Sequence, residues 1–239
     1  DNWSLVVPEA MACSKPVLCS QYNGAWPDLI EQGANLTFIC DLEKNKMAGL
    51  ADFIKDVQPQ PPQQVQEMRH IFDSKDVDVV AVVTPDHWHA LQTIHACQAG
   101  KDVYVEKPLA NSIQEVDLMI KAQQRYNRVV QVGQWQRSDP HWKAAVDFVH
   151  SGKLGKIRTV KSWVYLDWKH MLPVQPDAPV PGGVDYDFWL GPAPKRPFNK
   201  NRFHFTFRWF WDYAGGMMTD WGVHLLDIVQ WAMGFDYPQ

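Results

Sequence analysis

The chain has 239 residues, of which 46% are hydrophobic and 21% are charged, and its net charge at pH 7 is -4. This length can bury one large core or two modest ones, so we expect one to two globular domains. The acidic balance and the lack of any run of Lys or Arg disfavour nucleic-acid binding. No apolar stretch approaches the ~20 residues that would span a bilayer, so we expect no membrane segment.

The chain starts at Asp1 with neither an initiator Met nor a signal-peptide pattern, so we expect that its true N-terminus is missing. We expect a cytoplasmic protein, with the periplasm as the alternative. The four cysteines lack Cys-x-x-Cys spacing and have core-like neighbours. This pattern favours buried, reduced thiols over a disulfide framework or a zinc site.

The middle of the chain alternates between apolar runs and helical patterns. Val77 to Pro85 is a β-branched run that ends in a turn signal, typical of a strand buried on both faces of a parallel sheet. Ser112 and Glu115 have the spacing of a capping box at the start of a helix. The further predicted elements are a helix at 89–98, a strand at 102–106, a helix at 112–126 and a strand at 129–132. This alternation predicts βαβ units in a doubly wound, Rossmann-like sheet.

After Pro140 the pattern changes. We expect a helix at 141–150, an alternating strand at 156–168, a surface loop rich in Pro and Gly at 171–197 and a final helix at 218–233. A Gln-rich stretch at 58–66 is predicted to be a loop or linker. The chain is therefore predicted to hold a Rossmann-like domain at 1–137 and an α/β domain with an open, mainly antiparallel sheet at 138–239.

Two motifs carry the chemistry. Glu106-Lys107-Pro108 ends an apolar strand, where an α/β sheet places its functional groups, and Asp220 and His224 lie four residues apart on one face of a predicted helix. Together they resemble the Gfo/Idh/MocA family of NAD(P)-dependent sugar and polyol oxidoreductases, over about residues 57–239. The resemblance implies an enzyme that transfers a hydride between a sugar or cyclic polyol hydroxyl and nicotinamide. It also implies that the second domain is incomplete, because the family's sheet continues beyond the point that matches Gln239.

The resemblance implies catalytic roles for three residues. Lys107 would contact the hydroxyl that is oxidised and stabilise the developing alkoxide charge. His224 would be the general base, and Asp220 would orient it or bind a neighbouring hydroxyl. Asp227 would support His224 or cap the helix surface, and these two interpretations have equal weight. The structural alternative for Lys107 is a surface lysine paired with Glu106.

The cofactor is expected to be NAD, with NADP as the less favoured alternative. Asp41 follows another apolar run and would take a ribose hydroxyl, with no neighbouring Arg to receive a 2′-phosphate, although an exposed acid at a helix N-terminus is an equal interpretation. The resemblance adds residues from the loops that follow the strands. These cofactor candidates are Thr84, Pro85, His89, Glu106, Lys107, Pro108 and Gln134.

The substrate candidates are Gln136, Arg208, Trp209 and Asp212, from a region rich in aromatic residues. The chain has 12 Trp, and flat aromatic faces suit sugar surfaces, but they are more often core or subunit interface. We expect a homo-oligomer. Asp86, His87 and His89 also suggest a metal site, but His-x-His lacks the further ligands here, so no metal is expected.

The first third of the chain departs from the oxidoreductase pattern. Residues 1–60 contain no Gly-x-Gly-x-x-Gly turn for a pyrophosphate. Residues 4–33 instead resemble the donor-binding half of a retaining GT-B glycosyltransferase, with Glu9 at the sugar-nucleotide glutamate and Asp1 at the preceding one. We therefore expect a chimera with a junction between Asn35 and Val57. The alternative functions are a glycosyltransferase fragment, an NAD-assisted glycoside hydrolase of the same family, and an inactive chimera.

Overall fold

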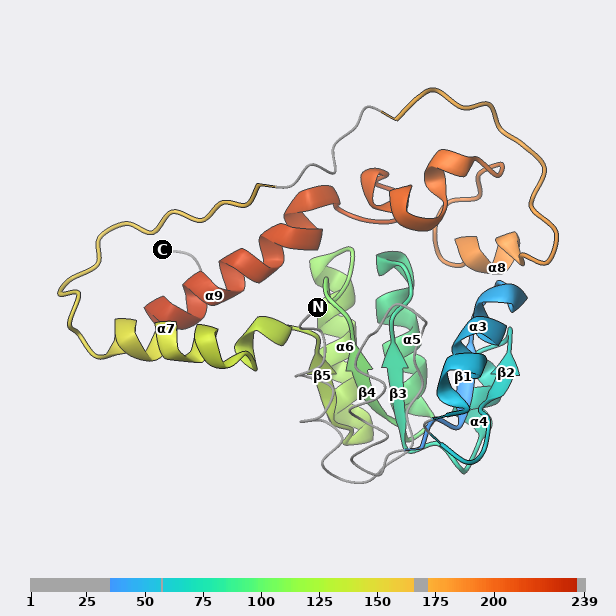
Figure 1. Cartoon of the computed structure of the whole chain (residues 1–239), viewed down its shortest axis with the longest axis horizontal. Helices are drawn as coiled ribbons and strands as arrows, with labels where there is room; N and C mark the ends of the chain where they lie inside the picture. Colours follow the sequence, from blue (N-terminus) through green and yellow to red (C-terminus); the bar gives the residue numbers. More distant parts are fainter. Residues whose placement is uncertain (1–34, 57, 166–171, 236–239) are drawn as a thin grey trace.

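The computed structural model describes residues 35–56, 58–165 and 172–235 (Figure 1). Its strands are parallel: β1 pairs with β2, and β4 lies between β3 and β5. The elements are β1 (Phe38–Cys40), α3 (Lys44–Ile54), β2 (Gln63–Val65), α4 (Arg69–Asp73), β3 (Val79–Val82), α5 (Asp86–Gln98), β4 (Asp102–Val105), α6 (Ile113–Tyr126), β5 (Val130–Val132), η1 (Trp135–Arg137), α7 (Pro140–His150), α8 (Tyr186–Leu190), η2 (Lys200–Arg202), η3 (His204–Trp209), η4 (Met218–Gly222) and α9 (Val223–Met233).

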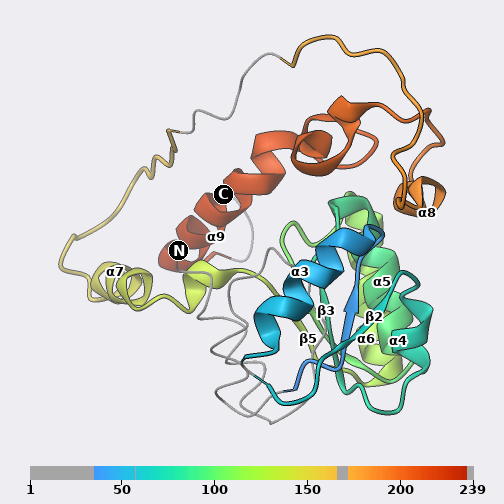
Figure 2. The ribbon, with the colours of Figure 1, turned by 45° about the vertical axis from the view of Figure 1, so that its right-hand side comes forward.

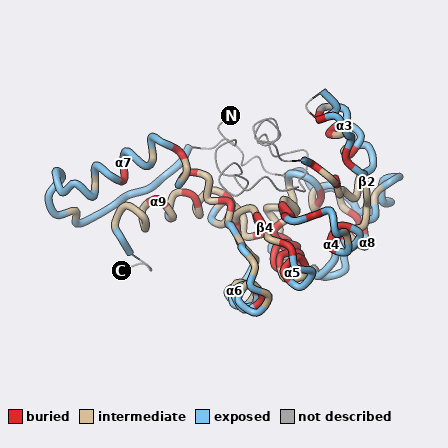
Figure 3. The backbone as a smooth tube through the Cα atoms, turned by 90° about the horizontal axis from the view of Figure 1, so that it is seen from below, coloured by how far each residue is buried: buried red, intermediate tan, exposed pale blue. Residues whose placement is uncertain are grey.

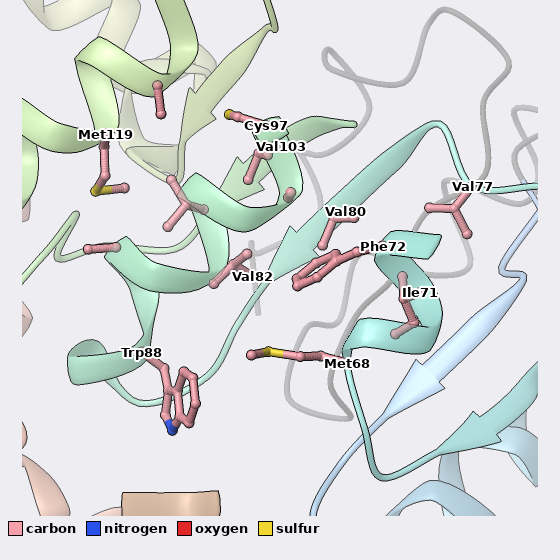
Figure 4. Packing of buried hydrophobic residues seen from close by; sticks show 14 of the residues in the cluster. Met68, Ile71, Phe72, Val77, Val80, Val82, Trp88, Cys97, Val103 and Met119 are labelled. Atoms are coloured by element: carbon pink, nitrogen blue, oxygen red, sulfur yellow. The ribbon is translucent and has the colours of Figure 1, made fainter. Parts of the chain in front are cut away.

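The sheet buries both faces because successive side chains of a strand point in opposite directions. On β3, Val79 and Ala81 pack in one cluster with α3, whereas Val80 and Val82 pack in a second cluster with α4, α5 and α6. Figure 2 shows α3 on one side of the strands and α5 and α6 on the other, and Figure 4 shows the second cluster from close by. Helices on both faces confirm the predicted doubly wound, Rossmann-like architecture.

The helix starts follow local signals. At α6 the Glu115 amide donates to Ser112 Oγ at 3.2 Å and the Ser112 amide donates to Glu115 Oε2 at 2.9 Å, which confirms the predicted capping box. Helix α5 starts at Asp86, three residues before the predicted start at His89. An acid in the first turn suits the positive end of the helix dipole, so Asp86 belongs to the helix rather than to the loop.

The C-terminal part, residues 140–235, contacts the Rossmann-like part through aromatic residues. His87 Nε2 and Trp88 Nε1 both lie 2.9 Å from the backbone oxygen of Trp189, at the end of α8. The chain passes so close to Trp88 that a Cβ on Gly191 would lie 2.0 Å from the indole ring. Only glycine fits at this position, which fixes α8 against the start of α5. Helices α7 and α9 lie side by side in Figures 1 and 2.

Three predictions of secondary structure are wrong. The predicted surface loop at 171–197 contains α8, whose start is capped by Asp185. The predicted loop at 58–66 contains β2, whose Gln63 and Gln64 hide its strand character because they are polar. The predicted strand at 156–168 is not formed over its described residues, 156–165. Its alternating pattern is real, but no described segment pairs with it, and Tyr165 is 92% exposed. Figure 3 shows this segment as exposed, whereas β4, α4 and α5 carry many buried residues.

We predict that Ser112→Ala lowers the free energy of unfolding by about 1 kcal/mol, because the amide of Glu115 loses its capping acceptor. Denaturant unfolding followed by circular dichroism measures the change. The matched control is Ser162→Ala, an exposed serine outside every described helix and strand. An equal loss in the two variants would contradict the capping explanation.

Candidate active site

A cleft of about 520 Å³ lies where the carboxyl ends of the parallel strands meet the C-terminal part. This is the edge at which open α/β sheets bind ligands. The structure brings together at this cleft most of the residues predicted from the sequence. Those that line it are Asp41, Thr84, Pro85, His89, Glu106, Lys107, Arg208, Asp220 and His224.

Lys107 and Asp220 form an ion pair across the cleft. Lys107 Nζ donates to the Asp220 carboxylate and also to the Asp220 backbone oxygen at 3.0 Å. Arg208 Nε donates to the second carboxylate oxygen at 2.7 Å. Burial acts to raise the pKa of Asp220, but the charges and hydrogen bonds of Lys107 and Arg208 outweigh it and hold this pKa below its usual value. Asp220 is therefore a fixed anion that keeps Lys107 in place.

His224 lies on α9, one turn beyond Asp220, and is 2% exposed. Its ring packs at the edge of Trp135 and Trp221, with centroid distances of 5.8 and 5.9 Å. Burial and then the charge of Lys107 lower its pKa from 6.5 to about 4. The imidazole is therefore neutral at pH 7, which is the form that can accept a proton. Its Nδ1 has no hydrogen-bond partner among the described residues.

His89 ties together the loops that follow β3 and β4. Its Nδ1 lies 2.6 Å from the Pro108 backbone oxygen and its Nε2 lies 2.8 Å from the Thr84 backbone oxygen. Burial, only partly offset by these two contacts, lowers its pKa. Thr84 Oγ1 donates to Gln92 Oε1 at 2.8 Å, which fixes the same loop from the helix side. The ends of β3 and β4 are thus held together where the cleft opens.

The two remaining predicted acids have backbone partners. Asp41 Oδ1 accepts from the Glu43 amide at 2.8 Å, and burial raises its pKa. Glu106 accepts from the amide of Lys107 and from the Tyr104 hydroxyl, each at 3.2 Å, and burial raises its pKa as well. The Lys107 ammonium pairs with Asp220 and not with Glu106. The alternative of a surface Lys107–Glu106 pair is therefore wrong.

Several predicted site residues lie outside the cleft lining. Asp212 pairs with Arg196 at 2.8 Å, away from the predicted substrate position. Gln136 is buried at 5% exposure, and Pro108 reaches the site only through its contact with His89. Asp227 accepts two hydrogen bonds from Arg137, at 2.7 and 2.8 Å, so it anchors α9 to η1. The predicted contacts outside the lining are Pro108, Gln134, Gln136, Trp209 and Asp212.

The histidines considered as metal ligands have other partners. His87 contacts the Trp189 backbone oxygen, and His89 contacts two further backbone oxygens. Among the described residues, no three His, Cys, Asp or Glu side chains are grouped so that they could hold a metal ion. Within the same residues, no helix is long and apolar enough to cross a membrane.

Sequence reasoning missed two features of the cleft. Asp86 lines it at 9% exposure, although the sequence motif suggested this residue only as a metal ligand. Arg208 was predicted to contact substrate or cofactor, and the structure makes it a partner of Asp220. The sequence could have predicted that Asp86 lines the cleft, because an acid that starts a helix directly after a buried strand lies at the carboxyl edge of a parallel sheet.

The chain belongs to the Gfo/Idh/MocA oxidoreductase family. The family profile described as "Oxidoreductase family, NAD-binding Rossmann fold" matches residues 24–134, and the profile of the family's C-terminal alpha/beta domain matches residues 141–238. Together the two profiles cover most of the chain. The Rossmann match starts ahead of the predicted junction between Asn35 and Val57, and the comparisons do not support the glycosyltransferase chimera. Asp1 and Glu9 lie outside the described residues.

The similar proteins are oxidoreductases. An uncharacterized oxidoreductase of Rhizobium meliloti is 33% identical over 51% of this chain and 36% of its own length. Levoglucosan dehydrogenase of Pseudarthrobacter phenanthrenivorans is 34% identical over 43% of this chain and 26% of its own.

Solved structures share the fold. An oxidoreductase domain protein from Kribbella flavida has a TM-score of 0.65 at 24% identity, over 92% of this chain and 53% of that one. The WlbA dehydrogenase of Bordetella pertussis, solved with NADH and UDP-GlcNAcA, has a TM-score of 0.67 at 19% identity, over 92% of this chain and 57% of that one. The chain thus spans little more than half the length of these structures.

Two buried histidines should make stability depend on pH. Burial lowers the pKa of His87, like that of His224, from 6.5 to about 4. Below pH 6.5 these two histidines bind protons in the unfolded chain but not in the folded chain, so their contribution lowers the free energy of unfolding as the pH drops from 6.5 towards 4. Asp86 contributes in the opposite direction, because burial raises its pKa to about 7 and the folded chain then binds a proton that the unfolded chain does not. Urea unfolding at a series of pH values measures this slope.

Replacing His224 by Gln should remove its contribution, so that on going from pH 6.5 to 4 the free energy of unfolding becomes higher relative to the unsubstituted protein, because the unfolded state gains one proton fewer. His70→Gln, which removes an exposed histidine, is the matched control and should leave the slope unchanged. A slope that is the same in His224→Gln and in the unsubstituted protein would contradict the assignment of a neutral His224.

Proposed function

We propose that the protein is an NAD-dependent oxidoreductase that transfers a hydride between a hydroxyl of a sugar or cyclic polyol and nicotinamide. The observation that carries this proposal is the Lys107–Asp220 ion pair, which lies beside a buried, neutral His224 in one cleft. The fold and family agree with it. Relatives whose names state a substrate include levoglucosan dehydrogenase and inositol 2-dehydrogenase, whose substrates carry several ring hydroxyls.

The cleft fits a nicotinamide dinucleotide in its chemistry. Asp41, directly after β1, presents a partly buried carboxylate for ribose hydroxyls, and the loop after β3 contributes Thr84 and Pro85 to the lining of the same cleft. Lys107 lines the same cleft, and the reacting hydroxyl would lie beside its ammonium group. A bound nicotinamide ring would supply the hydride acceptor. Residues 1–34, from which a pyrophosphate site would come, are outside the described part of the chain.

Each residue of the cleft then has a defined task. The Lys107 ammonium donates to the oxygen of the reacting hydroxyl and favours its alkoxide character. The neutral imidazole of His224 accepts the hydroxyl proton as the hydride leaves carbon. Asp220 cannot compete for that proton, because two cations lower its pKa, and it instead keeps Lys107 at the reacting oxygen. Arg208 holds Asp220 from the other side and is therefore a positioning residue.

We predict that Lys107→Ala lowers turnover by about a hundredfold or more and leaves the affinity for NADH within about threefold, because Lys107 acts on the reacting oxygen. Initial rates of NADH formation with myo-inositol and with levoglucosan measure turnover, and calorimetry measures NADH affinity. Lys121→Ala, on the exposed surface of α6, is the control. An equal loss of NADH affinity in Lys107→Ala would refute the catalytic role. If the protein cleaved a glycoside and no NADH accumulated, the proposed net oxidation would be wrong and redox-assisted glycoside hydrolysis would be the function instead.

We also predict that the protein binds NADH at least tenfold more tightly than NADPH. The carboxylates of Asp41 and Glu43 both line the cleft at the end of β1, and they would repel a 2′-phosphate. Calorimetric titration with each dinucleotide measures the preference, and Asp41→Ser should reduce it. Asp56→Ser, an exposed acid beyond the end of α3, is the control. Tighter binding of NADPH would reverse the cofactor assignment.

The expected homo-oligomer and the expected domain boundary at residue 137 stay predictions.

A further inference from the structure

Asp86 is the unpaired acid of the cleft. It is the first residue of α5, directly after β3, and its side chain is buried at 9% exposure while still lining the cleft. Within the described residues, no ion pair and no hydrogen bond from another residue reaches its carboxylate. A buried carboxylate without a partner is costly, because burial removes the water that would solvate its charge. Such a group at a cleft wall is suited to a ligand that brings its own hydrogen-bond donors.

The other acids of the cleft have partners. Glu43 pairs with Lys46 at 3.1 Å, and Asp41 and Glu106 accept backbone amides. Asp220 is shared by Lys107 and Arg208. The two nearby cations are thus committed to Asp220 and leave Asp86 without an ion pair, although their charges act on it from a distance.

The lining of the cleft carries a surplus of negative charge. The lining has five carboxylates, from Asp41, Glu43, Asp86, Glu106 and Asp220, and three cations, from Lys46, Lys107 and Arg208. Burial first, and then the charge of Asp220, raise the pKa of Asp86 to about 7. A further carboxylate brought by a substrate would meet this surplus in a partly desolvated site, where like charges repel strongly.

The cleft lining also includes aromatic side chains. Phe188 and Trp189 come from α8, and Phe205 and Phe207 come from η3. Flat aromatic faces cover the C–H surface of a sugar ring, while carboxylates accept hydrogen bonds from the hydroxyls at its rim. The cleft therefore combines the two kinds of contact that an uncharged polyhydroxylated ring needs.

We propose that Asp86 is a substrate-binding carboxylate, which accepts hydrogen bonds from hydroxyls next to the reacting one and selects uncharged sugars or polyols over sugar acids. This inference rests on the proposed function, because it assumes that the substrate lies beside Lys107. It assigns a specificity-determining role to a residue that neither the catalytic pair nor the cofactor contacts include.

The test compares D-glucose with D-glucuronate, which differ by one carboxylate. Their affinities for the NADH-loaded protein are measured by calorimetry at about pH 8, above the pKa of Asp86, so that its carboxylate is charged. The unsubstituted protein should bind glucose more tightly. In Asp86→Asn, glucuronate should gain about tenfold in affinity and glucose should lose about tenfold, because one charge and one charged acceptor are removed. Asp86→Ser, also neutral, should shift the selectivity in the same direction.

Asp78→Asn is the matched control, because it removes the same charge from an exposed residue just before the start of β3, at the opposite edge of the sheet. It should keep the preference of the unsubstituted protein. Unchanged selectivity in both Asp86 variants, tighter binding of glucuronate by the unsubstituted protein, or no binding of either sugar with NADH bound would overturn the inference. Loss of NADH affinity in both Asp86 variants would show that Asp86 contacts the cofactor, and this outcome would also overturn the inference. Failure of the unsubstituted protein to bind NADH would instead reject the proposed function itself.

Discussion

The carboxylate of Asp220 is the interaction on which the rest of the site depends. It accepts from Lys107 at the end of β4 and from Arg208 in η3, so one side chain joins three separate segments. All three charged side chains are largely buried, with exposures of 11% for Lys107, 10% for Asp220 and 18% for Arg208. Removing Asp220 would leave two partly buried cations without their shared partner, which is far more costly than the pairs are stabilising. The network therefore positions the lysine and also holds the C-terminal part against the sheet.

A second set of contacts makes this arrangement possible. The Trp189 backbone oxygen accepts from both His87 and Trp88, and Gly191 allows the chain to pass over the indole. These contacts set α8 and the aromatic cluster beside the start of α5. Arg137, in η1, holds α9 through two hydrogen bonds to Asp227. The walls of the cleft thus come from both parts of the chain, and the same contacts that join the two parts position them.

Much of the Rossmann-like part could be read from the sequence, because its signals are local. The β-branched run at 77–85 and the capping box of Ser112 and Glu115 specify their elements without help from distant residues. The strand at 156–168 illustrates the limit, since an alternating pattern shows that a segment can pair but not whether a partner is present. Polar Gln63 and Gln64 hid β2 for the same reason: parallel pairing with β1 decides its conformation.

In the candidate site, too, some residues could be identified from the sequence and others only from the fold. Lys107, Asp220 and His224 were found because they form motifs, and the fold brought them together. Asp86 and the role of Arg208 were not found, because burial and the choice of partner depend on tertiary packing. Asp212 looked equally suitable in the sequence, yet it pairs with Arg196 outside the cleft lining. Residue type and spacing therefore identify candidates, whereas the absence or presence of a competing partner decides among them.

The helical turn that contains Asp220 limits which mutations the site can accept. Residues Met218–Gly222 form a π-helical turn that leads directly into α9. Such a turn holds one residue more than an α-helical turn, and it is rare outside functional sites. Deleting one residue from it would restore α-helical register and rotate everything before it by about 100° relative to α9. The chain that precedes the turn and carries Arg208 would then meet α9 in a different orientation, so this motif can tolerate substitutions around it far better than a change in its length.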